Sequence, residues 1–215
     1  MDGNERSQAS DGQASRKPPP LVPGLHIVAT PIGNMRDITL RALDVLREAD
    51  LIACEDTRVF AKLASHYGIA APTVAYSDAT QDAAEPRIVR ALAAGKRVAL
   101  VSDAGMPLIS DPGYRLVRAA LAGDHVVTSA PGASAVPMAL ALSGLPTDRF
   151  FFGGFLPAKE SERRRAIASA AASLTEAPAI AARNASSSRS AAGAAASLGG
   201  PMTMAISPFT SGWRA

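Results

Sequence analysis

The sequence predicts an α/β protein built on a mostly parallel sheet. Apolar, strand-like segments alternate with amphipathic helical segments from about Leu25 onward, and this alternation favours parallel strands joined by crossover helices. The continuous apolar run at residues 98–101 is typical of a strand that is covered on both faces. Loops containing glycine and proline follow several of these strands, at the end of a parallel sheet where ligands usually bind.

Each expected element has a local signal. Apolar residues at helical spacing indicate the first helix, Gly68 can end the second helix in a left-handed conformation, and Pro86 suits the first turn of the third. We expect strands at residues 25–30, 50–54, 73–76, 98–101, 125–129 and 149–155. We expect helices at residues 39–49, 57–67, 86–94, 114–122, 134–143 and 159–173.

Changes of composition along the chain predict four parts. Residues 1–23 are polar and rich in proline, which indicates a disordered lead-in. Residues 24–130 are expected to form an N-terminal α/β domain, and residues 131–173 a partial C-terminal α/β domain. Residues 174–215 are dominated by alanine and serine, whose side chains bury little apolar area, so a poorly packed tail is expected there.

The overall composition excludes several classes of protein. Hydrophobic residues make up 47% of the 215 residues and no run reaches the length of a membrane span. The single cysteine, Cys54, excludes an internal disulfide framework and a cysteine-rich zinc site, and the three histidines are far apart in the sequence. We therefore expect a cytoplasmic protein without a metal. The net charge of +3 permits nucleic-acid binding without requiring it.

Four loops that follow expected strands are candidates for chemistry: residues 30–34, 55–58, 102–113 and 130–135. The longest of them, residues 102–113, repeats a Ser-Asp pair and contains two glycines and two prolines. Proline stiffens such a loop and glycine exposes its backbone groups, which favours a nucleoside-like ligand held by main-chain hydrogen bonds. No Gly-Lys-Ser or Gly-Lys-Thr follows, so a triphosphate loop is not expected.

The loop at residues 55–58 is open to three interpretations. Adjacent carboxylates at Glu55 and Asp56, with Arg58 beside them, suggest a general base, a cation site or the N-terminal cap of a helix. Asp56 and Thr57 are both good capping residues. Glu55 has a weaker reason to serve as a cap, which leaves it available for chemistry.

Five long motifs resemble a known family. VATPIGNMRDITLRAL, LIACEDTR, VALVSDAGMPLISDPGYRLV, APGASA and SGLPTDRFFFGGFLP are similar, in order and spacing, to the bacterial ribosomal RNA small-subunit methyltransferases I of the tetrapyrrole methylase superfamily. The resemblance covers residues 24–165. It implies two α/β domains with S-adenosylmethionine bound in the cleft between them, a homodimer, and 2′-O-methylation of a cytidine in the 16S rRNA of the small ribosomal subunit.

The resemblance also assigns residues. The cofactor-binding residues that it implies are Pro31, Gly33, Ala104, Gly105, Met106, Leu108, Ile109, Pro131, Gly132, Ser134 and Ala135. The acidic motif near the RNA side comprises Glu55, Asp56 and Arg58, and Glu55 or Asp56 is the candidate base for the ribose hydroxyl. Basic residues that could contact RNA phosphates, or could equally be solvated, are Arg36, Arg41, Arg58, Lys62 and Arg163–Arg165.

The chain departs from the family in three places. Met106 stands where the family usually has threonine, Tyr76-Ser77-Asp78 replaces a Tyr-His-Glu-like segment, and the pattern is lost after about Ala172. A changed reading frame or a degraded gene would explain the last departure. Three other functions therefore remain open: a tetrapyrrole methyltransferase, a non-catalytic remnant, and a hydrolase with a metal held by Glu55, Asp56, Asp103 and Asp111.

Overall fold

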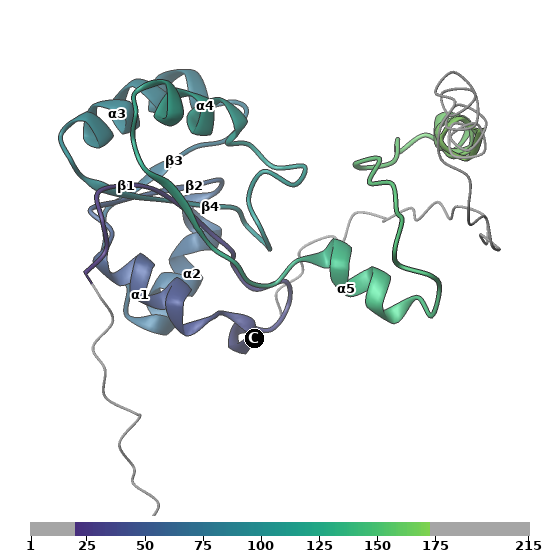
Figure 1. Cartoon of the computed structure of the whole chain (residues 1–215), viewed down its shortest axis with the longest axis horizontal. Helices are drawn as coiled ribbons and strands as arrows, with labels where there is room; N and C mark the ends of the chain where they lie inside the picture. Colours follow the sequence, from purple (N-terminus) through teal and green to yellow (C-terminus); the bar gives the residue numbers. More distant parts are fainter. Residues whose placement is uncertain (1–19, 173–215) are drawn as a thin grey trace, which may run out of the picture.

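The chain forms a five-stranded parallel sheet with helices on both faces, within the residues that the computed structural model describes, 20–172. The strand order is β3-β2-β4-β1-β5. Helices α1 and α2 cover one face, and α3 and α4 cover the other (Figure 1). This arrangement confirms the predicted α/β fold class.

Most elements lie where the sequence placed them. The strands are β1 (Gly24–Val28), β2 (Leu51–Cys54), β3 (Thr73–Ala75), β4 (Arg97–Val101) and β5 (Val127–Ala130). The helices are α1 (Leu40–Glu48), α2 (Thr57–Tyr67), α3 (Gln81–Ala93), α4 (Tyr114–Ala122) and α5 (Ala135–Leu142), with a short 3-10 helix at Met35–Asp37. Residues 160–172 are also helical.

The hydrophobic core consists of one cluster on each face of the sheet. Successive residues of the central strands alternate between them, so that Ile52 and Ala99 join the cluster under α1 and α2. Ala53 and Leu100 join the cluster under α3 and α4. Because side chains of a strand point alternately to its two faces, strands that are apolar throughout fill both layers. The prediction that residues 98–101 form a strand covered on both faces is confirmed.

Two helix ends show why the sequence folds locally as it does. The Asp56 side chain accepts a hydrogen bond from the Arg58 backbone N–H and caps the start of α2. Gly68 ends the same helix with a φ of 65°, a left-handed conformation that glycine adopts at low cost. These two signals are the reason that α2 has the bounds expected from the sequence.

The structure corrects two predicted elements. Helix α3 begins at Gln81, so Pro86 lies inside the helix and not in its first turn. The apolar stripe of Ala84, Ile88 and Leu92 is buried, and packing of this stripe extends the helix past the proline's missing N–H. The expected strand at residues 149–155 does not form as a regular strand, because no neighbouring strand of the sheet pairs with these residues within the described range.

The packed part of the chain begins slightly before the expected residue 24. Leu21 packs against the core, and its N–H donates to Glu48 Oε2 at 3.0 Å. The rest of the expected lead-in, residues 1–19, and the expected tail lie outside the described residues, as does Ser173 at the end of the last predicted helix. The division into two domains stays a prediction.

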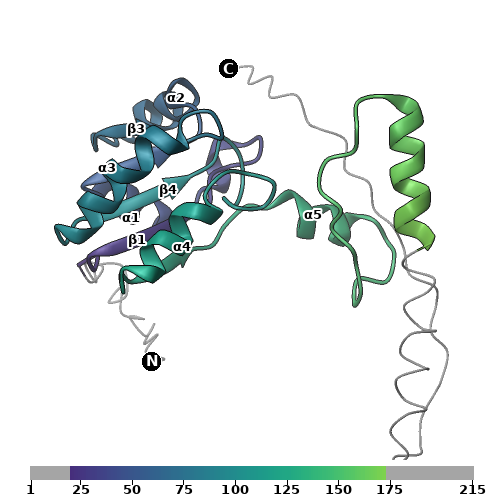
Figure 2. The same cartoon turned by 90° about the horizontal axis from the view of Figure 1, so that it is seen from above.

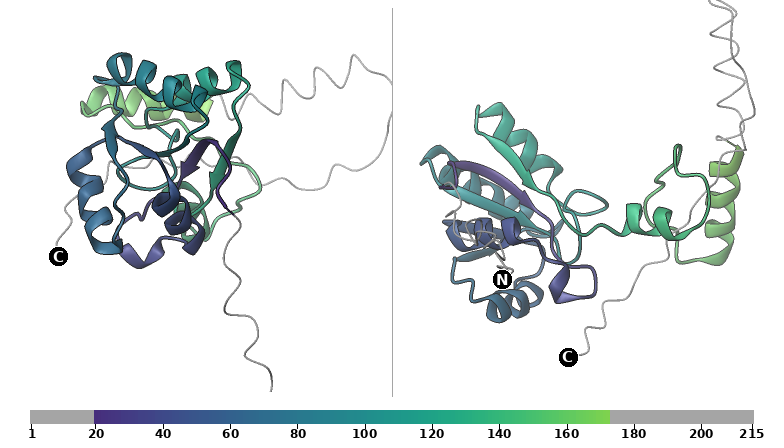
Figure 3. Two further views of the ribbon diagram at one scale, coloured as in Figure 1. Left: turned by 90° about the vertical axis from the view of Figure 1, so that its left-hand side faces the viewer. Right: turned by 60° about the horizontal axis from the view of Figure 1, so that its bottom comes forward.

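The segment after β5 lies to one side of the sheet. Helix α5 and the helical residues 160–172 extend away from the strands in Figures 1 and 2 and in the right-hand view of Figure 3. The chain leaves the sheet at the carboxyl end of β5. Residues 134–136 and, farther along the chain, Phe152, Gly154 and Phe155 line a cavity together with the loop that follows β4.

Candidate functional site

The four candidate loops meet at one edge of the sheet. Strands β1, β2, β4 and β5 are parallel neighbours, so their carboxyl ends lie at the same edge. Each loop follows one of these strands directly. The prediction that the loops are neighbours is therefore confirmed, and this edge is where ligands bind in open parallel sheets.

A pair of backbone hydrogen bonds joins the first loop to the third. Thr30 N donates to Gly105 O at 2.9 Å, and Gly105 N donates to Thr30 O at 3.1 Å. Gly105 has a φ of 89°, and a Cβ at this position would lie 3.2 Å from Ile32 Cγ2. Only glycine suits this close approach of two backbones. Gly105 lines one cavity and Thr30 lines another, which we call the larger and the smaller cavity.

The larger cavity encloses about 570 Å³ of empty space, part of it open to solvent, within the described region. Six of the eleven predicted cofactor-binding residues line it: Ala104, Gly105, Met106, Ile109, Ser134 and Ala135. Its remaining walls are Ile32, Ser110, Asp111, Val136, Phe152, Gly154 and Phe155. Small residues and exposed backbone on one side, and aromatic rings on the other, give a surface suited to a nucleoside.

The sequence did not predict that Phe152 and Phe155 line the larger cavity, because this depends on tertiary structure. Phe152 and Phe155 belong to a segment that was expected to be a strand, and their approach to the loop after β4 depends on the path of the chain beyond α5. A single signal was available for Asp111, the repeated Ser-Asp pair of the 102–113 loop, but it does not show which cavity the carboxylate borders.

The loop at residues 102–113 is conformationally strained. Leu108 and Ser110 have φ values of 75° and 65°, which cost about 1–3 kcal/mol each for residues with a side chain. A Cβ at Gly113 would lie 3.2 Å from Leu108 Cδ2 and 2.8 Å from Leu100 Cδ2. The Leu108 side chain thus packs beside Gly113, toward Leu100 of the core. Leu108 is not among the residues that line the larger cavity.

The other predicted cofactor-binding residues lie around the larger cavity without lining it. Pro31 is buried and borders the smaller cavity. Nothing lies within 4 Å of a Cβ built at Gly33. A Cβ at Gly132 would lie 3.0 Å from Ala29 Cβ, so this glycine lets the chain after β5 pass close to the end of β1, and the adjacent Pro131 is exposed. Their cofactor contacts stay predictions.

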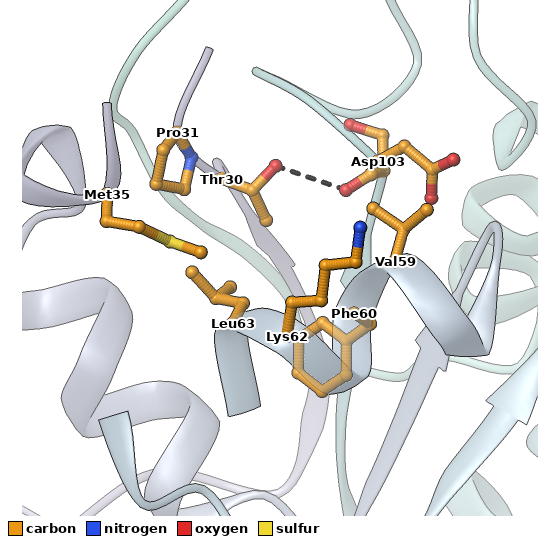
Figure 4. Close-up of a pocket in the computed structure, with 9 residues that line it drawn as sticks. Thr30, Pro31, Met35, Val59, Phe60, Lys62, Leu63 and Asp103 are labelled. Atoms are coloured by element: carbon orange, nitrogen blue, oxygen red, sulfur yellow. Dashed lines mark hydrogen bonds between the residues drawn. The ribbon is translucent and has the colours of Figure 1, made fainter. Parts of the chain in front are cut away.

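The smaller cavity lies between the loop after β1, the start of α2 and the loop after β4 (Figure 4). It encloses about 350 Å³, partly open to solvent. Its walls are Thr30, Pro31, Met35, Val59, Phe60, Lys62, Leu63, Ser102 and Asp103. Thr30 Oγ1 donates to Ser102 O at 3.1 Å. The amino group of Lys62 points toward the side where Thr30 and Asp103 lie.

Carboxylates gather beside the smaller cavity. The Asp103 backbone N–H donates to Glu55 Oε2 at 3.4 Å, and the Asp56 backbone N–H donates to Asp103 Oδ1 at 3.1 Å. Burial raises the pKa of Glu55, and the negative charges of Asp103, Asp78 and Asp56 raise it further. Burial also raises the pKa of Asp103. Crowded, partly buried carboxylates hold protons more readily than isolated ones.

Glu55 and Asp56 differ in their electrostatic surroundings. The side-chain and backbone hydrogen bonds from Arg58 lower the pKa of Asp56 to about 2, and its Oδ2 lies 2.6 Å from Arg58 Nη2. A carboxylate with so low a pKa is a weak base. Glu55 has no such cation partner among the described residues, and its raised pKa suits proton acceptance. Of the two predicted bases, the structure favours Glu55.

The predicted basic residues have different environments. Arg41 donates to the backbone oxygen of Ser129, and Arg58 pairs with Asp56. In the last helical segment Arg164 pairs with Glu160, and Arg163 donates to the backbone oxygen of Ala158. Within residues 20–172, Arg36 and Lys62 have no acidic partner within 4 Å, so their charges are available to a ligand.

The described residues contain no group of three or more potential ligands that could hold a metal ion. The hydrolase alternative requires such a group at Glu55, Asp56, Asp103 and Asp111. In the same part of the chain, no helix combines the length and the apolar character needed to cross a bilayer.

Comparison with known proteins identifies relatives. Residues 24–204 match the family described as tetrapyrrole (corrin/porphyrin) methylases. This match runs beyond Ala172, after which the sequence analysis expects the family pattern to be lost. The ribosomal RNA small subunit methyltransferase I of Mesorhizobium japonicum is 53% identical over 152 residues, which are 71% of this chain and 52% of that protein. The protein of the same name from Xylella fastidiosa is 53% identical over 140 residues, which are 65% and 51%.

A solved structure shares the fold. A conserved hypothetical protein from Aeropyrum pernix K1 superimposes with a TM-score of 0.50 and 26% identity, over 61% of this chain and 46% of that one. The chain spans about half the length of the ribosomal RNA methyltransferases that it matches.

Proposed function

Because the chain belongs to the tetrapyrrole methylase family, we propose that it binds S-adenosylmethionine in the larger cavity and methylates ribosomal RNA. The finer proposal is that the acceptor is the ribose 2′-hydroxyl of a cytidine in 16S rRNA, within the small ribosomal subunit. Relatives at 53% identity carry the name ribosomal RNA small subunit methyltransferase I. This identity supports rRNA over a tetrapyrrole as the acceptor.

The larger cavity fits the proposed cofactor. Gly105 leaves space that a Cβ would fill 3.2 Å from Ile32, and Ala104, Ser134 and Ala135 add small side chains. These residues would hold the nucleoside and amino-acid parts through backbone groups, while Phe152 and Phe155 offer rings against which a base can stack. When bound, the cofactor supplies an electrophilic methyl carbon on a positively charged sulfur.

The acceptor is proposed to lie on the other side of the Thr30–Gly105 bridge. Ser102 and Asp103 border the smaller cavity, and the next two residues, Ala104 and Gly105, border the larger one. An in-line displacement needs the acceptor oxygen in direct contact with the methyl carbon, so the acceptor ribose is proposed to reach from the smaller cavity past this bridge to the methyl group. Holding donor and acceptor in line contributes most of the rate of such a displacement, about 7–11 kcal/mol in favourable cases.

Glu55 is the proposed general base. Its carboxylate accepts a hydrogen bond from the backbone N–H of Asp103, a residue that lines the smaller cavity. It would take the proton that the ribose hydroxyl loses as the new carbon–oxygen bond forms. Asp56 is proposed to hold the start of α2 and to orient Arg58, through the contacts described above, rather than to accept the proton.

Basic side chains around this edge are proposed to hold the RNA backbone. Lys62 borders the smaller cavity, Arg36 lies in the loop after β1, and both have free charges among the described residues. Contacts of this kind position a nucleic acid without reading its sequence. A homodimer, which the family resemblance implies, is part of the proposal and is tested by analytical ultracentrifugation.

The observation that carries this function is that consecutive residues of one loop border the two cavities, Asp103 the smaller and Ala104 the larger. The direct test incubates the full chain with small ribosomal subunits and radiolabelled S-adenosylmethionine, followed by digestion of the rRNA and mass spectrometry of the nucleosides. We expect label in 2′-O-methylcytidine. Label in a methylated base, or in an added tetrapyrrole and not in rRNA, would overturn the proposed acceptor. Cofactor binding without transfer would support the non-catalytic alternative.

A further inference from the structure

Asp111 is the one charged side chain among the described residues that line the larger cavity. The other walls are aliphatic, aromatic or small, with hydroxyls only at Ser110 and Ser134. Asp111 is half-buried and lies between Ser110, with its φ of 65°, and the Gly113 turn, with a φ of 135°. The strained loop thus places a carboxylate at the wall of an otherwise uncharged cavity.

No cation of the described chain neutralises this carboxylate. The ion pairs of residues 20–172 do not include Asp111. Its charged neighbours are instead Glu55 and Asp103, both negative. Burial and these charges raise the pKa of Asp111 to about 6, against an opposing interaction with the Ser102 side chain. A cation bound in the cavity would relieve this repulsion.

Given the proposed function, we propose that Asp111 supplies the counter-charge by which the larger cavity selects a sulfonium ligand over the corresponding neutral thioether. S-adenosylmethionine and S-adenosylhomocysteine share the nucleoside and the amino-acid group, and they differ in one methyl group and the positive charge on sulfur. Both ligands also carry the same ammonium group, so a contact of Asp111 with that group would favour both equally, whereas a contact with the sulfur favours only the sulfonium ligand. The attraction to the sulfur therefore ends when the methyl group leaves, which favours exchange of the product for a new donor.

This role differs from proton transfer and from shape recognition. Glu55 is hydrogen-bonded to the backbone of Asp103, which lines the smaller cavity, whereas Asp111 itself lines the larger cavity. The rings of Phe152 and Phe155 can also attract a cation, and Asp111→Asn leaves them in place, so this substitution isolates the contribution of the carboxylate. Asp111 is thus a specificity-determining residue of the same site.

The test measures binding of both ligands by isothermal titration calorimetry to the wild type and to Asp111→Asn, using the full chain. We expect Asp111→Asn to weaken S-adenosylmethionine binding about tenfold or more, which corresponds to about 1.4 kcal/mol. Binding of S-adenosylhomocysteine should change less than about threefold. Asp111→Glu, which keeps the charge, should restore part of the preference for the sulfonium ligand.

Asp124→Asn is the matched control. Asp124 is exposed, has a φ of 55° that asparagine also tolerates, and lies before β5, away from the cavity. It should change neither affinity. Equal weakening of both ligands by Asp111→Asn, at an unchanged circular dichroism spectrum, would overturn the inference and leave the proposed function standing. A wild-type protein that binds neither ligand would overturn both.

Discussion

The sheet and the segment after it bury their apolar side chains to very different extents. In the sheet and its helices, leucine, isoleucine and valine fill two continuous clusters. Between residues 131 and 172 Leu140 is the one buried large apolar side chain. The exposed large apolar residues of this segment are Met138, Leu142, Leu145, Phe150, Phe151, Phe152, Phe155 and Ile167.

This difference separates stability from ligand recognition. The sheet supplies the core, the strained loop and the carboxylates, so it holds its part of the site by its own packing. The later segment contributes Ser134–Val136, Phe152, Gly154 and Phe155 to the lining of the larger cavity. Few of its own apolar side chains are buried. Substitutions of the buried apolar residues under the sheet should therefore change stability, whereas substitutions of the exposed residues of the later segment should change stability little.

The largest expected effect is the loss of S-adenosylmethionine binding when a bulky side chain is placed at Gly105, where the sheet loops approach the later segment. Gly105→Val places a branched side chain at a φ of 89°, with its Cβ 3.2 Å from Ile32 and 3.6 Å from the Ala133 oxygen, so it should abolish S-adenosylmethionine binding. The far-UV circular dichroism spectrum should stay nearly unchanged. Gly95→Val is the control, because Gly95 has a φ of 71° but nothing within 4 Å of a Cβ. Unaltered affinity in Gly105→Val would remove this loop from the site.

Replacing the proposed base should affect transfer and spare binding. Glu55→Gln keeps the size and much of the hydrogen bonding of the side chain, yet it cannot accept a proton, so single-turnover methyl transfer to small ribosomal subunits should fall about 10²–10⁴-fold. Asp56→Asn, which we expected from the sequence to act similarly, should now have a much smaller effect, because the pKa of Asp56 is lowered to about 2. Wild-type transfer rates in Glu55→Gln would exclude it as the base.

A pair of leucine substitutions tests the difference in packing directly. Leu46 in α1 is 0% exposed and Leu142 in α5 is 79% exposed. In urea unfolding of the full chain, Leu46→Ala should lower the free energy of unfolding by about 2–5 kcal/mol, and Leu142→Ala by less than about 0.5 kcal/mol. Similar losses in the two variants would show that the segment after β5 is packed as well as the sheet.

The smallest effect is a pH dependence of stability. Because burial raises the pKa of Asp111 from 3.8 to about 6, its contribution to stability is full below about pH 4 and is lost as the pH rises through the folded-state pKa. Asp111→Asn should therefore gain stability relative to the wild type between pH 4 and pH 7, by at most about 3 kcal/mol. Urea unfolding at the two pH values checks this, and a constant difference between the two proteins would contradict it.

Much of the fold follows from local signals in the sequence. Helix α2 has the predicted bounds because Asp56 and Gly68 mark both ends, and α4 also has them. Pro86 wrongly predicted that α3 begins near residue 86. The helix begins at Gln81, because packing of Ile88 and Leu92 outweighs the one hydrogen bond lost at the proline. The phenylalanines of residues 150–155 have strand propensity, but a strand also needs a partner, which a sequence pattern cannot show.

The sequence predicts which loops form the candidate site, but it does not predict all the residues that line the larger cavity. Parallel strands bring residues 30–34, 55–58, 102–113 and 130–135 to one edge, and this followed from the alternation of elements. The roles of Asp111 and Leu108 depend on which way the strained backbone turns each side chain, and Phe152 reaches the cavity through tertiary contacts. None of these features is encoded in a local motif.

The central claim is that the larger cavity binds the methyl donor, and one titration tests it most directly. S-adenosylmethionine should be titrated calorimetrically into the full 215-residue chain, with Gly105→Val measured in parallel. We expect saturable binding of one molecule per chain in the wild type and none in the variant. Absence of binding to the folded wild-type protein at millimolar concentrations, or equal binding to both proteins, would contradict the claim.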